Sequence, residues 1–116
     1  MKKIYYLKTC STCQRIIKEL GGLEDFEHQN IKETAMTEAQ VDQMKDMAGS
    51  YEALFSRRSM KYRAWDLHEK ELTEADYKKY ILEEYTFLKR PVLIIGNHIF
   101  VGNSKKVVAA AAEKIG

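Results

Sequence analysis

The segment that decides the fold runs from Ile4 to Leu20 and reads IYYLKTCSTCQRIIKEL. Its first four residues are apolar or aromatic without alternation, which is typical of a buried strand in a parallel sheet. Apolar residues then recur three, four and seven positions after Cys13, as they do along one face of a helix. A pair of glycines follows and ends that pattern. The segment therefore predicts a strand, a turn and a helix, with Cys10 at the turn.

The rest of the chain supplies three further strands around a helical middle. Residues 26–30 alternate in polarity, which favours a second strand. Residues from about 32 to 87 carry helical spacings, interrupted by a basic and polar loop at residues 56–63. Two apolar runs, 92–95 and 98–101, are separated by a glycine-asparagine pair, which is the pattern of a β-hairpin. A serine then starts a final helix.

This order of elements predicts an α/β fold, namely a thioredoxin-like mixed four-stranded sheet with a helical insertion at about residues 32–87. A length of 116 residues suits a single thioredoxin-like domain spanning residues 1–116. Pro91, the one proline, opens the third strand and fits this arrangement. We expect the aromatic side chains of residues 77–87 to lie in the core rather than on a binding platform.

The composition argues against two classes of partner. The formal net charge is only +2, so the chain lacks the strong basic charge that favours binding to nucleic acid. The longest apolar runs, 92–95 and 107–112, are far shorter than the ~18 residues of a membrane span. The basic start is followed by too short an apolar stretch for a signal peptide. We therefore expect a cytoplasmic protein that binds neither membranes nor nucleic acid directly.

Cys10 and Cys13 are the two cysteines of the chain and form a C-x-x-C motif. A disulfide scaffold would contain more cysteines, and a structural zinc site would need four ligands. The three histidines lack the spacing of zinc ligands, so the sequence predicts no metal site. In a reducing compartment a C-x-x-C pair favours redox chemistry.

The position of Cys10 makes it the candidate nucleophile. Unpaired N–H groups and the positive end of the helix dipole lower the pKa of a thiol at a helix N-terminus. Cys13 lies one turn further along, where it can resolve a mixed disulfide on Cys10 into a Cys10–Cys13 bond. The alternative is that both thiols are small apolar core residues. That alternative suits Cys13, on the apolar helix face, better than Cys10, because a turn is a poor core position.

Arg58 and Arg90 are candidate binding residues, because the guanidinium fork suits oxyanions and carboxylates. Arg90 precedes Pro91, in a loop that a thioredoxin-like sheet places beside the cysteine-bearing turn. Arg57 and Arg63 share the basic loop with Arg58, and spacing alone does not choose among the three. A solvated surface charge is the alternative for each of these arginines.

Three stretches together resemble the arsenate reductase (ArsC)/Spx/YffB family: YYLKTCSTCQR at 5–15, RSMKY at 58–62 and LKRPV at 88–92. The resemblance covers nearly the whole chain in the same order, including the hairpin and the Val-Gly-Asn that follows it. It implies a thioredoxin-like sheet with a helical insertion. In arsenate reductases of this family, the cysteine matching Cys10 attacks arsenate, and arginines matching Arg58 and Arg90 bind the oxyanion.

Two features distinguish this chain from those arsenate reductases. They carry a third arginine at the exit of the last strand, where this chain has Gly102. They also usually have a single cysteine in the motif, whereas Cys13 supplies a second thiol. The glycine resembles the Spx and YffB branches of the family, and the second thiol resembles Spx.

The resemblance implies a thiol-dependent oxidoreductase in which Cys10 and Cys13 are catalytic and Arg58, Arg90 and Pro91 bind the substrate. The substrate is then a small oxyanion or a glutathione-type mixed disulfide. No bound cofactor is expected, and glutathione or a protein of the glutaredoxin or thioredoxin type supplies electrons as a co-substrate. The alternative is an Spx-like transcriptional regulator that binds RNA polymerase and uses the two cysteines as a redox switch.

Overall fold

A computed structural model describes every residue from Met1 to Gly116. The chain folds into two compact units. The first is formed by Met1–Ala35 together with Arg90–Gly116, and the second by Met36–Lys89. The second unit overlaps the range 32–87 that the sequence predicts for the helical insertion.

The first unit is built on a four-stranded sheet with the strand order β2-β1-β3-β4. Strand β1 is parallel to β2 and antiparallel to β3, and β3 and β4 form an antiparallel hairpin. The strands are β1 at Lys2–Tyr6, β2 at Glu27–Asn30, β3 at Val92–Ile95 and β4 at His98–Val101. This confirms the predicted mixed sheet. The first strand lies earlier than residues 4–7, because Leu7 belongs to the turn and accepts a hydrogen bond from the Cys10 N–H.

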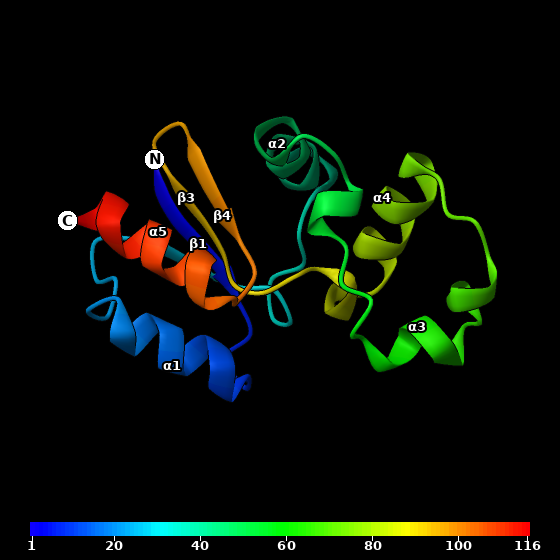
Figure 1. Ribbon diagram of the computed structural model, residues 1–116, viewed down its shortest axis with the longest axis horizontal. Coiled ribbons are helices and arrows are strands. Elements are labelled where there is room, and N and C mark those ends of the chain that lie inside the picture. Colours follow the sequence, from blue (N-terminus) through cyan, green and yellow to red (C-terminus); the bar gives the residue numbers. More distant parts are fainter. The chain divides into compact units, whose positions relative to one another are not determined.

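Two helices complete this unit, α1 at Ser11–Glu19 and α5 at Lys105–Ile115, and they lie side by side (Figure 1). The hydroxyl of Ser104 accepts the Val107 N–H at 3.2 Å and caps α5, as predicted. One face of the sheet packs against α1 and the loop that follows it. Its buried residues are Ile4, Leu23, Phe26, Leu93 and Ile95. This packing fixes the direction in which α1 leaves the turn at Cys10.

The second unit is helical and has an aromatic core. Its helices are α2 at Glu38–Ala48, α3 at Met60–Ala64 and α4 at Glu74–Glu83, with 3₁₀ turns at Glu52–Leu54, Leu67–Glu69 and Tyr85–Phe87. The ring of Phe55 stacks on Phe87 at 5.0 Å and lies 4.9 Å from the ring of Tyr77. Tyr77 and Phe87 are buried, which confirms the core position predicted for them, whereas Tyr80 and Tyr85 are only half-buried. No helix in the structure is long and apolar enough to cross a membrane.

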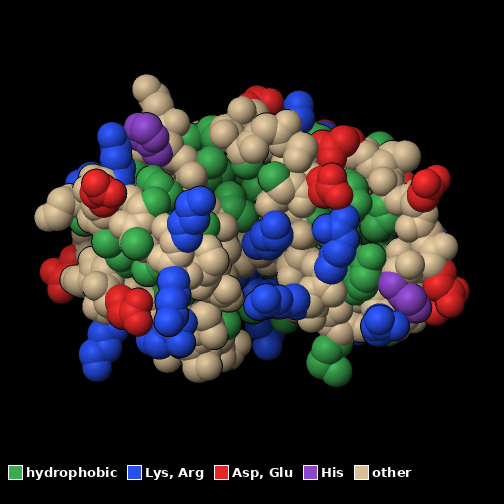
Figure 2. Space-filling view, viewed as in Figure 1, with side chains coloured by type: hydrophobic (Ala, Val, Ile, Leu, Met, Phe, Trp, Pro, Cys, Tyr) green, Lys and Arg blue, Asp and Glu red, His purple; other side chains and the backbone are tan.

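Helix α3 corrects the prediction of a loop over residues 56–63. A turn does follow Phe55, but the chain becomes helical at Met60, and the Ser59 hydroxyl caps the helix by accepting the Lys61 N–H at 3.2 Å. No residue of α3 is buried, so the helix has no apolar periodicity that sequence analysis could detect. Met60 is 89% exposed, and Figure 2 shows apolar atoms projecting from the surface beside α3.

Candidate active site

Cys10 is the N-cap residue of α1. Its backbone is extended, with φ −87° and ψ 112°, so the side chain stands at the end of the helix rather than along it. The N–H of Cys10 donates to the Leu7 carbonyl at 3.1 Å, and its carbonyl accepts the Gln14 N–H at the same distance. These two bonds fix the turn from both sides. The thiol is half-buried and is therefore within reach of a reagent from solvent.

The surroundings of Cys10 stabilise its thiolate. Burial by itself raises the pKa of the Cys10 thiol, but the N–H groups of Cys13 and Thr12, the Cys13 thiol and the charge of Arg90 outweigh it. The net result is a pKa below the ordinary value of 9.0. The two N–H groups face the sulfur without the geometry of a regular capping hydrogen bond, so they act mainly as oriented dipoles. The local structure thus favours the thiolate form of Cys10.

Cys13 differs from Cys10 both in its burial and in the direction of its pKa shift. Its side chain is fully buried, and burial raises the pKa of the thiol to about 11. The neighbouring Cys10 sulfur raises that pKa further, whereas the Leu7 backbone and the Arg90 charge lower it. Cys13 therefore remains a thiol at neutral pH and donates a hydrogen bond to the Cys10 sulfur. The thiolate of the pair therefore belongs to Cys10.

Arg90 and Pro91 lie at the start of β3, in the same compact unit as the cysteines. The positive charge of Arg90 acts on both thiols and lowers the pKa of each. Its Nη1 atom is buried and has no hydrogen-bond partner. Pro91 is buried, is joined to Arg90 by a cis peptide bond, and uses its carbonyl to accept the Gly102 N–H at 2.9 Å. The structure thus brings Arg90, Cys10 and Cys13 together.

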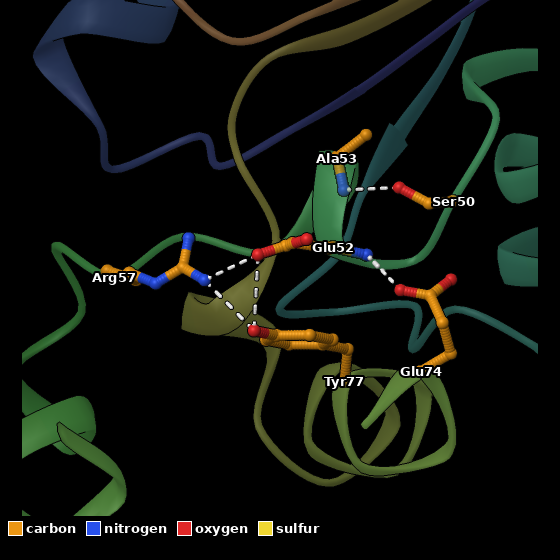
Figure 3. A network of polar contacts seen from close by, with 6 residues as sticks. All are labelled: Ser50, Glu52, Ala53, Arg57, Glu74 and Tyr77. Atoms are coloured by element: carbon orange, nitrogen blue, oxygen red, sulfur yellow. Dashed lines mark hydrogen bonds and ion pairs between the residues drawn. The ribbon is translucent and has the colours of Figure 1, made fainter. Parts of the chain in front are cut away.

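The three arginines of the predicted basic loop differ in what they contact, and all belong to the helical unit. Arg57 donates to Glu52 Oε2 at 2.8 Å and to the Tyr77 hydroxyl oxygen at 2.9 Å (Figure 3). Arg58 and Arg63 are exposed, and neither guanidinium has a hydrogen bond or an ion pair. The one hydrogen bond that Arg58 forms with a side chain comes from its backbone N–H, which donates to the Ser56 hydroxyl oxygen.

Sequence reasoning missed the polar cluster of Glu52, Arg57 and Tyr77. The Tyr77 hydroxyl also donates to Glu52 Oε2 at 3.3 Å, so the three side chains contact one another (Figure 3). Glu52 and Tyr77 are 25 positions apart, and no local pattern connects them. The aromatic periodicity of α4 predicted where the Tyr77 ring lies but carried no information on its hydroxyl. No group of three or more metal-ligating side chains occurs in the structure.

Comparisons with known proteins place the chain in a family. The model of the ArsC family matches residues 5–111. A search of the curated proteins found no match. Among solved structures, a YFFB protein has 22% identity and a TM-score of 0.78, covering 97% of this chain and 99% of its own.

Two further structures have the same fold. An arsenate reductase from Vibrio cholerae has 15% identity and a TM-score of 0.79, covering 94% of this chain and 95% of its own. An arsenate reductase (ArsC) related protein from Brucella melitensis has 21% identity and a TM-score of 0.72, covering 94% and 92%. At these identities the structures show only that the chain has the thioredoxin-like fold. The family model matches nearly the whole chain, and this chain therefore belongs to the ArsC family.

Proposed function

We propose that the chain is a thiol-dependent oxidoreductase with Cys10 as its nucleophile and Cys13 as its resolving thiol. One observation carries this proposal. The Cys10 thiol has a lowered pKa at the start of α1, and the buried Cys13 thiol, with a raised pKa, donates a hydrogen bond to it. Because the two pKa values differ, Cys10 can attack as a thiolate while Cys13 keeps its proton.

The reaction proceeds in two steps that transfer two electrons to the substrate. The Cys10 thiolate first attacks a sulfur of a mixed disulfide, forming a new disulfide and releasing the other sulfur as a thiol. Cys13 then loses its proton and attacks the Cys10 sulfur, which forms the Cys10–Cys13 bond and releases the rest of the substrate as a second thiol. With an oxyanion, Cys10 instead bonds to the central atom and displaces a hydroxyl group, which takes up a proton from solvent and leaves as water. Attack of Cys13 on the Cys10 sulfur then breaks the bond to the central atom, and the electron pair of that bond stays on the central atom, which is reduced by two electrons. Glutathione, or a dithiol protein of the glutaredoxin or thioredoxin type, returns the pair to the reduced state.

Arg90 is the proposed anchor for the anionic part of the substrate. Its Nη1 atom is buried without an acceptor, which is costly for an N–H group. A carboxylate or oxyanion oxygen would satisfy that group and would be held next to the nucleophile. Pro91 shapes the same loop. Arg58 is proposed as a second ligand on the strength of the family motif and of its unpaired guanidinium.

The test is an assay of the purified protein on two substrates, a glutathione mixed disulfide and arsenate, with glutathione and glutaredoxin as reductants. Cys10→Ser should abolish turnover of both. Cys13→Ser should retain only turnover in which external thiol can resolve the intermediate, so its rate should depend steeply on glutathione concentration. If Cys10→Ser keeps the wild-type rate, the proposed function is wrong.

A second candidate function is an Spx-like regulator that binds RNA polymerase, and the hydrogen bond between the two thiols favours it, because this pair could also close as a switch. Capture of purified RNA polymerase by the reduced and the oxidised protein tests it. A difference between the two states that disappears in Cys13→Ser supports the regulator. Equal failure of both states to bind counts against it.

A further inference from the structure

A groove lies between α1 and α5 in the sheet unit. Its volume is about 440 Å³, within the range of roughly 300–1,000 Å³ that is usual for sites of small molecules. Both helices belong to the same compact unit as the two cysteines, so the structure fixes where the groove lies relative to them. The helices run in the same direction, with their first residues on the same side of the unit (Figure 1). The groove therefore extends along both helices from a shared first end.

This first end lies next to the turn that carries Cys10. Cys10 caps α1, and Arg15, which lines the groove, follows five positions later on the same helix, about 7.5 Å along its axis. In the segment before α5, Gly102 donates its N–H to the Pro91 carbonyl at 2.9 Å. Pro91 follows Arg90, whose charge acts on both thiols. A molecule joined to the Cys10 sulfur can therefore extend from the thiols into the groove.

The polar side chains of the groove favour an anionic group. Lys105 and Asn103 line it, and neither side chain makes an ion pair or a hydrogen bond. Arg15 has one such contact, of 3.7 Å between its Nε and Glu19 Oε1, and both of these side chains are more than half exposed. A contact of that length between exposed charges holds an arginine only weakly. Two cations against one carboxylate, with hydrogen-bond donors to spare, are complementary to a carboxylate of a ligand.

The other side chains along the groove are apolar. They are Leu20, Val108, Ala109 and Ala112. Leu20 and Val108 are half-buried, and the two alanines are exposed. Covering such apolar surface is favourable, so the groove suits a ligand that has an aliphatic part as well as a charge. A bare oxyanion offers no such part, whereas a short peptide or another small carboxylic acid does.

We propose that this groove is a specificity subsite for small disulfides that carry a carboxylate remote from the reacting sulfur. The inference rests on the proposed function, because it takes the substrate as a disulfide that Cys10 attacks. Arg15 and Lys105 bind the remote carboxylate, and the aliphatic part of the same molecule lies along the apolar side chains. Arg90 binds an anionic group next to the sulfur, so the two anion sites act at different distances from the nucleophile.

The experiment measures alkylation of Cys10 by two maleimide acids, with the label assigned by peptide mapping. In 6-maleimidohexanoic acid, the long acid, five methylene groups separate the ring from the carboxylate, and in maleimidoacetic acid, the short acid, only one does. Each acid is compared with its neutral amide, and the ratio of the two rates cancels changes in thiolate fraction. Arg15→Gln and Lys105→Gln should each lower the long-acid ratio roughly threefold, within the range of an exposed ion pair. Both should have a smaller effect on the short-acid ratio.

Matched variants separate the groove from the general charge of the unit. Lys18→Gln and Lys106→Gln each remove a cation from the same two helices at an exposed position outside the groove, and both should keep the wild-type long-acid ratio. Ala109→Leu narrows the groove and should lower that ratio, whereas Ala110→Leu, exposed and outside it, should keep it. Equal effects of the groove variants and their controls would overturn the inference, because only a general field would then be acting.

Turnover distinguishes a failure of this inference from a failure of the proposed function. With a glutathione mixed disulfide as substrate, Arg15→Gln and Lys105→Gln should raise KM about threefold, and the rise should be smaller with bis(2-hydroxyethyl) disulfide, which has no carboxylate. If Cys10→Ser abolishes turnover but the groove variants change neither KM nor the long-acid ratio, the subsite is wrong and the proposed function stands. If Cys10→Ser keeps turnover, the proposed function is wrong, and the role of the groove as a substrate subsite is overturned with it.

Discussion

The two thiols should differ strongly in reactivity, and alkylation at controlled pH measures that difference. The perturbation is a pH series from 5 to 10 with iodoacetamide on the fully reduced protein. Cys10 lies half-exposed with a lowered pKa, whereas Cys13 is fully buried with its pKa raised to about 11. Since the thiolate is the reacting species, both differences favour Cys10.

The size of the effect follows from the two pKa shifts. At pH 7 a thiol with a pKa of about 11 is ionised to roughly one part in 10⁴, and one at the ordinary 9.0 to roughly one part in 10². Cys10 lies below 9.0, so ionisation favours it over Cys13 by at least ~100-fold. A thiolate of lower pKa is intrinsically less nucleophilic, and over two pKa units this reduces the rate advantage of Cys10 by a factor of roughly eight. Cys10 should therefore react at least ~10-fold faster at pH 7, before the burial of Cys13 adds to the difference.

Peptide mapping by mass spectrometry assigns the label at each pH. Cys10 labelling should rise with a midpoint below pH 9, and Cys13 labelling should remain low until the highest pH values. Cys13→Ala serves as the control, because it removes the side-chain donor to Cys10 and should raise the Cys10 midpoint. Labelling of Cys13 at a rate equal to or above that of Cys10 at pH 7 would refute the assignment of the nucleophile.

Four further outcomes are expected. Mild oxidation should close a Cys10–Cys13 disulfide, seen as the loss of two hydrogens in intact mass, and adducts or dimers alone would rule out Cys13 as the resolving thiol. Arg90→Ala should raise the pH midpoint of Cys10 alkylation, whereas Arg90→Lys should keep it, because a positive charge is enough to stabilise the thiolate. Turnover should fall in both variants, because only the guanidinium of arginine can bind an anionic substrate through two parallel hydrogen bonds. Asp42 accepts hydrogen bonds from a tyrosine and a lysine, which lower its pKa below 3.8. The contribution of this carboxylate to stability is therefore present above pH 3.8 and is lost as the pH falls through the pKa of the folded state. Asp42→Asn should thus lower the melting temperature at pH 6 more than at pH 2.5. Arsenate turnover by the unmodified protein, with glutathione and glutaredoxin, should be feeble, and robust turnover would contradict this.

The features that the sequence predicts correctly are those with a local signature. An uninterrupted apolar run, a C-x-x-C motif and a three-four-seven apolar spacing lie within residues 4–20, so strand, turn and helix could be placed there together. The glycine-asparagine pair fixed the hairpin for the same reason, because a two-residue loop sets the register of its strands. The sequence therefore predicts the position of Cys10 at the turn, and the structure confirms it.

The features that the sequence could not predict depend on partners far apart along the chain. Three arginines in the stretch 57–63 look equivalent as a pattern, and only the contacts of Arg57 with Glu52 and Tyr77 separate it from the other two. Helix α3 escaped prediction because a helix without a buried face has no apolar period. The orphaned Nη1 atom of Arg90 also has no sequence signature, because burial of one atom depends on the whole surrounding structure.

We expect feeble arsenate turnover because this chain has Gly102 where the arsenate reductases have a third arginine, and the backbone conformation of Gly102 suits glycine. This residue has φ +93°, in the left-handed region, and its N–H holds the turn to the Pro91 carbonyl at 2.9 Å. A Cβ built there meets nothing within 4 Å, so the position has room for a side chain but a backbone that disfavours one, by roughly 1–2 kcal/mol. The third arginine of the arsenate reductases is thus missing at a position whose conformation suits glycine. Gly102→Arg separates the two effects: it should lower the melting temperature through strain and raise arsenate kcat/KM through the added guanidinium. A strained variant with unchanged arsenate turnover would show that the missing arginine does not limit the reaction.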